Sequence, residues 1–237
     1  MEHIYEPAYV RTLFNKMSGS YERMNYITSF GFSIRWRKQH LQQLGASSDK
    51  KLKVLDLLSG LGENWSLLKQ HFPNAQFYSL DFSEAMVQRS QAKAQRVFNH
   101  TLQLSCENVL ENSYPSDSFD IISCAYGLKT FTDAQLEQLS RQLHRMLRVN
   151  GKFSFIEVSR PDNLLLRFFY RFYLSRVVPV LGKLFLGNPS DYKMLWVYTD
   201  KFGNSEKVKR IFESSGLKVS SQKYFFGCAS GVSGRKV

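Results

Sequence analysis

The sequence lacks any run of about 18 uncharged apolar residues, the length that a helix needs to cross a bilayer, so we expect no membrane span. The N-terminus shows neither the pattern of a signal peptide nor the composition of a transit peptide. The three cysteines, Cys106, Cys124 and Cys228, are far apart and form no C-x-x-C pair. We therefore expect reduced thiols in a cytoplasmic protein, with no disulfide and no metal site. The 237 residues, 43% of them hydrophobic, suit one large α/β domain or one domain with a small cap.

A glycine-rich segment from Val54 to Trp65 lacks the features of two common phosphate-binding turns. A dinucleotide-binding turn needs a third glycine where this chain has Trp65, and a P-loop needs a Lys followed by Ser or Thr. The apolar run Leu52–Leu58 predicts a buried parallel strand, Gly60 and Gly62 predict a tight turn, and a helix is expected from Glu63. The pattern hh-D-hh-x-G-x-G that remains is similar to the first motif of class I S-adenosylmethionine methyltransferases.

Strands and helices alternate along the middle of the chain, which predicts a doubly wound, mostly parallel sheet in an α/β fold. Four further strands are expected at Gln76–Leu80, Thr101–Ser105, Phe119–Ala125 and Lys152–Val158, and a strand pair at the C-terminus surrounds Gly227. The complete sheet would have seven strands, as in the Rossmann-like class I methyltransferase fold. Helices are expected within 8–45, where Ser33 would cap a helix that begins at Ile34. Further helices are expected at 84–97, capped by Ser83, at 132–147, beginning at Thr132, and at 206–215.

The segment 162–203 differs from the rest because it is rich in Leu, Phe and Tyr yet carries regularly spaced basic residues. Pro179 and Gly182 predict that its first half is broken into two short helices. We expect four parts: an N-terminal helical cap (1–50), a cofactor-binding core (51–161), a helical substrate cap (162–203), and a C-terminal helix and strand pair (204–237).

The formal net charge of +12 is concentrated in the flanks of the chain. Residues 51–159 hold 11 basic and 11 acidic side chains, whereas residues 160–237 hold 14 basic and 5 acidic ones. A basic surface can meet nucleic acid, anionic lipid or an anionic substrate, and the alternative is solvated charge that keeps the protein soluble. A nucleic-acid methyltransferase is disfavoured because no Asn/Asp-Pro-Pro-aromatic motif follows the fourth strand, where Ala125 to Leu128 stand.

Residues that follow the second and third strands would complete a nucleoside site. Asp81 lies 19 residues beyond Gly62, where a carboxylate can accept both ribose hydroxyls. Phe82 and Met86 would pack on the adenine, Asn108 would bond its edge, and Asp56 would lie near the glycine turn. The predicted set for S-adenosylmethionine is Asp56, Gly60, Leu61, Gly62, Asp81, Phe82, Met86, Asn108, Val109 and Ala125.

From about residue 14 to 237 the chain resembles the ubiquinone/menaquinone biosynthesis methyltransferases. The similar segments are Phe14 to Asn25 (family F-x-x-x-A-x-x-Y-D-x-x-N), Ala125 to Thr130 (A-x-x-F-G-L-R-N), Arg145 to Pro161 (R-V-L-K-P-G-G-x-x-x-x-L-E-F-S-x-P), Phe169 to Lys183, and Gly187 to Tyr192. The resemblance implies a class I fold, S-adenosylmethionine, and transfer of a methyl group to carbon of a lipid-linked quinol precursor.

Departures from the family pattern fall in the turn and in the substrate segment. The family's Gly-Gly-Thr-Gly is Ser59 to Gly62 here, and Lys129 replaces an Arg. The family's L-x-E-S-I-R-x-x-P is Leu195 to Gly203, so Asp200 stands where the family has an Arg tied to deprotonation of the ring hydroxyl. These differences favour a specialised acceptor, such as a prenylated or polyketide aromatic.

Carbon methylation of a phenol requires the phenol to be ionised, so a base or a positioned water is expected. The candidate catalytic residues are Tyr126, Glu157, Tyr192 and Asp200. Packing is the alternative role for both tyrosines, and a hydrogen-bonded structural acid is the alternative for Glu157. The five histidines match no motif and are expected on the surface or on helix faces.

Two other functions stay open: a protein of this fold that binds without methylating, in a cyclase-like or scaffold role, and the disfavoured nucleic-acid methyltransferase. The expected partner is an apolar small molecule, with no nucleic acid. The basic arginines of 164–186 favour peripheral contact with a membrane surface. The pattern leaves open whether the chain forms a homodimer.

Overall fold

In the computed structural model, residues 3–45, 49–185 and 189–237 are described, and no side chain is described between 184 and 193. One sheet has the order β3-β2-β1-β4-β5-β7-β6. Its strands are β1 (Lys53–Leu57), β2 (Gln76–Asp81), β3 (Gln103–Cys106), β4 (Phe119–Ala125), β5 (Leu147–Val158), β6 (Leu217–Tyr224) and β7 (Ala229–Lys236). Strands β1 to β5 pair in parallel, and β7 pairs antiparallel with both β5 and β6. The predicted doubly wound, mostly parallel sheet of an α/β fold is confirmed.

The helices are α1 (Pro7–Met17), α2 (Tyr21–Thr28), α3 (Phe32–Gln42), α4 (Trp65–His71), α5 (Glu84–Phe98), α6 (Asp133–Met146), α7 (Leu164–Phe172), α8 (Val178–Phe185), α9 (Pro189–Phe202) and α10 (Glu206–Ser214). The predicted cap at Ser83 is confirmed, and Thr132, predicted to begin a helix, is the N-cap of α6. The Ser83 hydroxyl accepts a hydrogen bond from the Met86 amide, and Thr132 forms a capping box with Gln135. Within the described ranges, every helix is too short or too polar to serve as a bilayer-spanning segment.

The core lies on both faces of the sheet because successive strand residues point to opposite sides. Val54 packs with Leu41 of α3 and Trp65 of α4, whereas Leu55 and Leu57 pack with residues of α6 and α10. Helices α3, α4 and α5 therefore cover one face, and α6 and α10 cover the other. Asp56 alternates with the apolar residues and points to the α3 side, which brings a carboxyl group beneath the glycine turn.

Four predicted boundaries were wrong. Strand β5 begins at Leu147 rather than Lys152, because the chain leaves α6 already extended and Asn150 turns at φ 65° within the paired strand. Helix α3 begins at Phe32 after Gly31 at φ 77°, so Ser33 lies inside the helix rather than capping it. Strand β1 ends at Leu57 because Leu58 adopts φ 54°, and α4 begins at Trp65 rather than Glu63.

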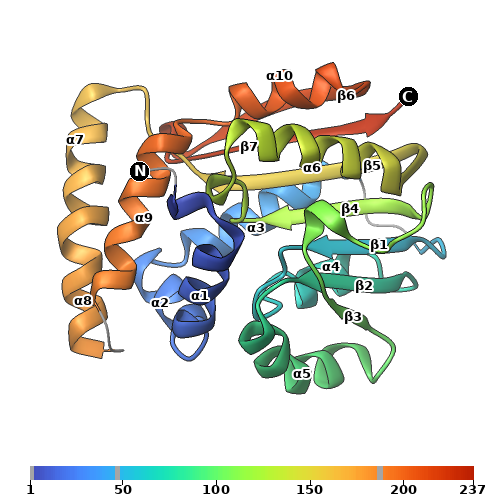
Figure 1. Ribbon diagram of the computed structural model, residues 1–237, viewed down its shortest axis with the longest axis horizontal. Coiled ribbons are helices and arrows are strands. Elements are labelled where there is room, and N and C mark those ends of the chain that lie inside the picture. Colours follow the sequence, from blue (N-terminus) through green and yellow to red (C-terminus); the bar gives the residue numbers. More distant parts are fainter. Residues whose placement is uncertain (1–2, 46–48, 186–188) are drawn as a thin grey trace.

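The expected break at Pro179 and Gly182 was also wrong. Both residues lie inside α8, and a π-helical turn at Tyr173–Val177 joins α7 to α8. Pro179 directly follows the π-helical turn, where the regular i→i−4 hydrogen bonding is already interrupted, so its missing amide hydrogen does not end the helix. The result is one long helical arm that lies beside α9 at the outer edge of the molecule (Figure 1).

The carboxyl ends of β1, β2 and β4 meet at one edge of the sheet. Helices α1 and α2 lie beyond this edge, together with the arm and α9 (Figure 1). Ligands of open α/β sheets bind outside the carboxyl ends of the strands, at the point where the strand order reverses. Here that point lies between β1 and β4. The N-terminal and arm helices therefore close over the place where a ligand is expected.

Candidate functional site

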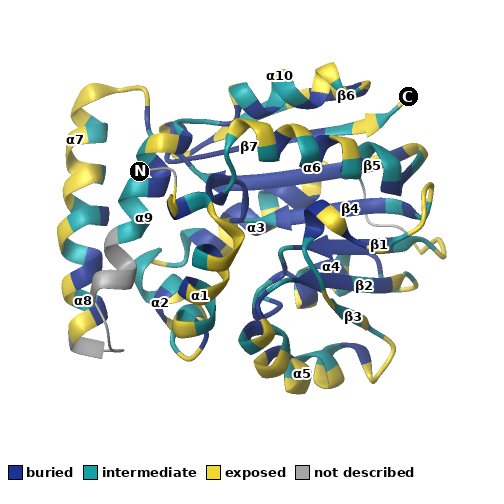
Figure 2. Cartoon of the chain, in the orientation of Figure 1, coloured by how far each residue is buried: buried dark blue, intermediate teal, exposed yellow. Residues whose placement is uncertain are grey.

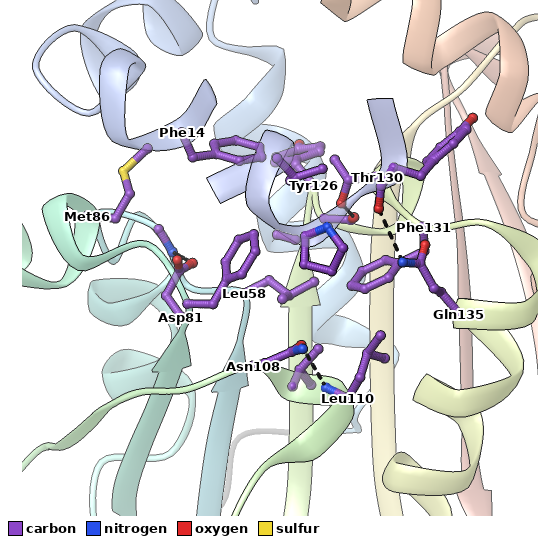
Figure 3. Close-up of a pocket in the computed structure, with 18 of the residues that line it drawn as sticks. Phe14, Leu58, Asp81, Met86, Asn108, Leu110, Tyr126, Thr130, Phe131 and Gln135 are labelled. Atoms are coloured by element: carbon purple, nitrogen blue, oxygen red, sulfur yellow. Dashed lines mark hydrogen bonds between the residues drawn. The ribbon is translucent and has the colours of Figure 1, made fainter. Parts of the chain in front are cut away.

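A pocket lies at the carboxyl ends of the central strands, and it brings together residues from distant parts of the chain. Seven of the predicted cofactor residues line it: Gly60, Asp81, Phe82, Met86, Asn108, Val109 and Ala125. Figure 3 shows Asp81 and Asn108 facing the same space from neighbouring strand ends. Of the other three predicted residues, Asp56 and Leu61 line neighbouring cavities instead, and Gly62 lies within the turn itself.

Asp81 ends β2, and its carboxylate is fixed at the mouth of the glycine turn. One oxygen accepts the Gly60 amide at 2.8 Å, and the other accepts the Ser83 amide at 2.9 Å. A carboxylate has about four acceptor positions, so both oxygens can still accept a ligand hydroxyl. Burial raises the pKa of Asp81 to about 6, so the group is mainly ionised at neutral pH. The two neighbouring hydroxyls of a ribose fit this arrangement.

The far end of the pocket suits an adenine ring. The Asn108 side-chain oxygen accepts the Leu110 amide at 3.1 Å, which fixes the carboxamide and leaves its NH₂ group for a ring nitrogen. Phe82, Met86 and Val109 provide apolar surface for the ring faces. The polar groups at the two ends of this pocket therefore match the two ends of a nucleoside.

Below the glycine turn a second, small polar cavity lies next to the pocket. It is lined by Arg37, Asp56, Leu58, Ser59, Glu63, Asn64 and Ala125. Four buried polar atoms around it have no hydrogen-bond partner among the described residues: Arg37 Nε, Asp56 Oδ2, Ser59 Oγ and Asn64 Oδ1. Buried polar atoms are normally paired, so this cavity fits a zwitterionic group that both donates and accepts. The amino-acid end of S-adenosylmethionine has this chemistry.

Charge inside this polar cavity is balanced by one cation. The Arg37 guanidinium lies 3.5 Å from Glu63 and 4.7 Å from the centre of the Tyr126 ring. The Asp56 carboxylate accepts the Asn64 side chain at 3.2 Å, and burial raises its pKa to about 7. Arg37 comes from α3, so an N-terminal helix supplies the charge that the core strands lack.

Backbone strain marks both strand ends that form the pocket. Leu58 after β1 has φ 54° and Tyr126 after β4 has φ 70°, values that bulky residues rarely adopt. Gly62 has φ 72°, and a Cβ there would lie 2.3 Å from the Trp65 ring. The turn therefore needs a glycine at this position both for its backbone angle and for the close packing of the tryptophan.

A larger apolar cavity of about 360 Å³ adjoins the nucleoside pocket. Both are lined by Phe14, Tyr21, Tyr126 and Thr130, so these four residues stand where the two cavities meet. The apolar cavity lies between α1, α2 and α3 on one side and α7, the π-helical turn, α8 and α9 on the other. Its lining includes Met17, Met24, Trp36, Leu166, Tyr170, Leu174 and Leu195.

Among the described residues that line the apolar cavity, Lys129 alone has a charged side chain. Its ammonium lies 2.8 Å from Glu157 Oε1 and donates to the Tyr126 carbonyl at 3.3 Å. Glu157 also accepts the Lys129 amide and the Val158 amide. Glu157 is fully buried and lines neither cavity, so it fixes Lys129 rather than facing a ligand.

The predicted catalytic candidates lie in four different settings. Tyr126 is at the junction of the cavities, where burial raises its pKa and its hydroxyl donates to the Ser33 carbonyl. Glu157 is the buried partner of Lys129. Asp200 is half exposed, pairs with Arg160 at 3.1 Å and lines neither cavity. Tyr192 lies in α9, and its side chain is outside the described residues.

Sequence reasoning placed no cofactor residue in the N-terminal helices, yet these helices cover the site. Tyr5, Pro7, Val10 and Phe14 line the nucleoside pocket. Helix α1 is fastened to α5 through Asn15, whose side-chain oxygen accepts the Ser83 hydroxyl at 2.6 Å. The match of Phe14 to Asn25 with the family's opening motif was the signal that this segment belongs to the site.

Several smaller predictions can also be compared with the structure. Asp120, the second residue of β4, pairs with Arg148 at 2.9 Å. The three cysteines are free thiols. His40 lies on a helix but is fully buried, and its Nδ1 is 3.1 Å from the Ser154 hydroxyl. Burial lowers the pKa of His40 to about 3, so this histidine is neutral.

Residues 2–236 match the model of the ubiE/COQ5 methyltransferase family. The chain is 30% identical over 210 residues to a demethylmenaquinone methyltransferase of Listeria welshimeri, and this alignment covers 88% of this chain and 87% of that protein. It is 29% identical over 231 residues to the enzyme of the same name from Lactiplantibacillus plantarum, covering 96% and 95%. The family match over 2–236 includes the N-terminal helices and the arm as well as the sheet.

Among solved structures, the fold is similar to that of an S-adenosylmethionine-dependent methyltransferase from Aquifex aeolicus. The TM-score is 0.58 at 16% identity, and the similarity covers 85% of this chain and 89% of that one. At this identity the comparison concerns the fold alone.

Proposed function

The chain belongs to the ubiE/COQ5 methyltransferase family, and from this premise we propose that it transfers a methyl group from S-adenosylmethionine to an apolar, quinol-like acceptor with a lipid tail. The acceptor atom in this proposal is a ring carbon, with a ring oxygen as the alternative. The observation that carries the proposal is the junction at Phe14, Tyr21, Tyr126 and Thr130, where a nucleoside pocket opens beside a large apolar cavity.

The cofactor would be held at three places by residues of this chain. Asp81 would accept the ribose hydroxyls, and Asn108 would donate to the adenine. Arg37 would bind the carboxylate of the amino-acid end, and Asp56 together with the polar atoms near Ser59 would accept its ammonium group. When bound, S-adenosylmethionine supplies an electrophilic methyl group on a positively charged sulfur. The protein would align the acceptor, exclude bulk water and favour ionisation of the ring hydroxyl, whose proton would pass to a positioned water molecule.

The apolar cavity favours an acceptor that is itself largely hydrocarbon and aromatic. The hydroxyls of Tyr126, Tyr170, Tyr173 and Tyr198 already donate to backbone carbonyls, and most of the remaining lining is aliphatic or aromatic. Two relatives named demethylmenaquinone methyltransferases share about 30% of this sequence over most of its length, which supports a quinol ring as the reacting group. A prenyl tail would occupy the part of the cavity between α2 and the arm.

Lys129 would activate the acceptor ring. A cation in an apolar cavity stabilises the anion of a ring hydroxyl, which makes the neighbouring ring carbon more nucleophilic. Glu157 holds the ammonium in place at 2.8 Å. This arrangement supplies positive charge near the acceptor although Asp200, rather than an Arg, occupies the family's position in α9. Tyr126, which keeps its proton, would form part of the wall between ring and cofactor.

The proposal is tested with prenylated naphthoquinols of increasing tail length, S-adenosylmethionine and product detection by mass spectrometry. We expect methylated product, and kcat/KM should rise with tail length because each buried CH₂ contributes about 0.8 kcal/mol. Lys129→Met should lower kcat by about 10²-fold, with unchanged affinity for S-adenosylhomocysteine, and Lys129→Arg should restore part of the rate. Methyl transfer to none of these quinols by protein that binds S-adenosylhomocysteine would refute the proposed acceptor.

A further inference from the structure

Helix α7 presents a row of large apolar side chains that no part of the described chain covers. Leu164, Leu165, Phe168 and Phe172 are all exposed, with Leu164 74% and Phe168 67% accessible. Successive residues of this set are one, three and four positions apart, which places all four on one face of the helix. Figure 2 shows this exposed face along the outer side of α7, directed away from the sheet. An isolated exposed apolar residue needs no explanation, but a contiguous face indicates a binding surface.

The same surface continues onto the rim of the apolar cavity. Phe30, Phe169 and Phe225 line that cavity and are nevertheless exposed, Phe30 to 76%. Phe30 contacts the Tyr173 ring of the π-helical turn at 5.9 Å between centroids, which joins the rim to the arm. Phe226, 81% accessible, stands beside Phe225, and both have positive φ values of 43° and 53°. The fold thus holds exposed aromatic rings at the cavity mouth in a strained backbone.

Basic residues flank the helical part of this surface, and the exposed acid that precedes α7, Asp162, is paired with Lys223 at 2.6 Å. Residues 163–190 contain four basic side chains, at Arg167, Arg171, Arg176 and Lys183, and no acidic one. Arg171 and Arg176 are exposed, and neither forms an ion pair with a described residue. An exposed row of Leu and Phe flanked by Arg is the composition of a helix that lies in the interface of an anionic bilayer.

We infer that the outer face of α7 and the aromatic rim at Phe30, Phe225 and Phe226 dock on an anionic lipid bilayer, with the cavity mouth opening directly into the lipid. The apolar residues enter the interface, and the arginines contact the lipid phosphates. A bilayer fits better than a protein partner because a protein seated on the rim would close the mouth, whereas a bilayer leaves it in contact with hydrocarbon. Delivery of a lipid-tailed acceptor through this mouth rests on the proposed function, but the docking itself does not.

The test is sedimentation of the purified protein with vesicles of phosphatidylglycerol or of phosphatidylcholine. We expect binding to the anionic vesicles that weakens with salt, and little binding to the neutral ones. Leu165→Ser/Phe168→Ser should weaken binding by more than about tenfold because two interfacial anchors are lost. Neither residue lines the cavity. Val149→Ser is the matched control, because Val149 is an exposed apolar residue near the start of β5, and this variant should bind as the wild type does.

Charge is tested separately. Arg171→Gln and Arg176→Gln should each weaken binding about fivefold, and Arg141→Gln, an exposed arginine on α6, should have no effect. Unchanged vesicle binding by the Leu165/Phe168 variant would overturn the inference. The inference would also be overturned if light scattering showed that the wild type is a dimer and that the Leu165/Phe168 variant is a monomer, because the surface would then be an interface between copies.

Failure of the docking and failure of the proposed function give different results. All arm variants should bind S-adenosylhomocysteine normally and methylate a short-tailed, water-soluble quinol at the wild-type rate. An arm variant that loses vesicle binding but keeps this activity would be impaired in docking alone. Wild-type protein that binds vesicles but methylates no quinol would contradict the proposed function and leave the docking surface supported.

Discussion

Arg37 provides the sharpest test of how the cofactor is held, because two related ligands differ only in the part that this residue would bind. S-adenosylhomocysteine carries an amino-acid end, and 5′-methylthioadenosine shares its nucleoside and sulfur but has no carboxylate. Arg37 is buried, faces the small polar cavity and has an unpaired Nε. The substitution Arg37→Gln should therefore weaken only the first ligand.

The magnitude follows from the type of bond. A hydrogen bond to a charged group contributes about 1.5–3 kcal/mol, or roughly 10- to 150-fold in Kd. Calorimetry of both ligands against wild type and Arg37→Gln should show this loss for S-adenosylhomocysteine and less than about a twofold change for 5′-methylthioadenosine. Equal losses for the two ligands, or none for either, would refute the assignment of Arg37.

Arg37 also pairs with Glu63 at 3.5 Å, so removing it leaves a buried carboxylate without its cation. The double variant Arg37→Gln/Glu63→Gln restores charge balance and should recover much of the lost thermal stability. It should not recover affinity for S-adenosylhomocysteine. This comparison separates a fault in folding from a lost ligand contact.

Three further predictions concern pH and the glycine turn. Affinity for S-adenosylhomocysteine should fall as pH decreases through about 6, because burial raises the pKa of Asp81 to that value and only its carboxylate accepts both ribose hydroxyls. Titration of Asp81→Asn should show weak binding with no such step. His40 has a folded pKa of about 3 against 6.5 when unfolded, so its contribution to stability should decrease as pH falls between these values, whereas the raised pKa values of Asp56 and Asp81 act in the opposite direction. Between pH 7 and pH 5, urea unfolding should therefore show that the wild type loses about 2 kcal/mol of stability relative to His40→Gln, in which only the two acids act. Gly62→Ala should cost more than about 3 kcal/mol, from a positive φ and from a clash with Trp65, whereas Gly203→Ala, at φ 69° with no neighbour within 4 Å, should cost about 1 kcal/mol from backbone strain alone. Equal losses at the two glycines would disprove the role given to the tryptophan.

The strands and the nucleoside residues could be predicted because their signals are local. Strand β4 was predicted with the bounds that it has, and Asp81 follows from its distance to the glycine turn. The caps at Ser83 and Thr132 are likewise short-range hydrogen bonds that the sequence encodes within four residues. Such features need no knowledge of how distant segments pack.

The polar cavity could not be predicted, because Arg37 and Asp56 meet only after α3 packs on the sheet. Sequence periodicity placed Arg37 on a helix with other basic residues, and nothing local distinguished it from Arg35 or Lys38. The same holds for His40, which looks like a surface residue until Ser154 of β5 is placed beside it. The continuity of the arm was missed for another reason: Pro179 usually breaks a helix, but here it directly follows a π-helical turn whose hydrogen bonding is already irregular.

The central claim is that a nucleoside pocket and an apolar cavity meet at Tyr126, so that a methyl group passes from one to the other. The most direct measurement incubates the purified protein with S-adenosylmethionine deuterated in the methyl group and with demethylmenaquinol in anionic vesicles. Mass spectrometry and NMR then examine the product. We expect one labelled methyl group on a ring carbon and an equal amount of S-adenosylhomocysteine. Protein that binds S-adenosylhomocysteine through Asp81 but leaves both the labelled donor and the quinol unchanged would contradict it.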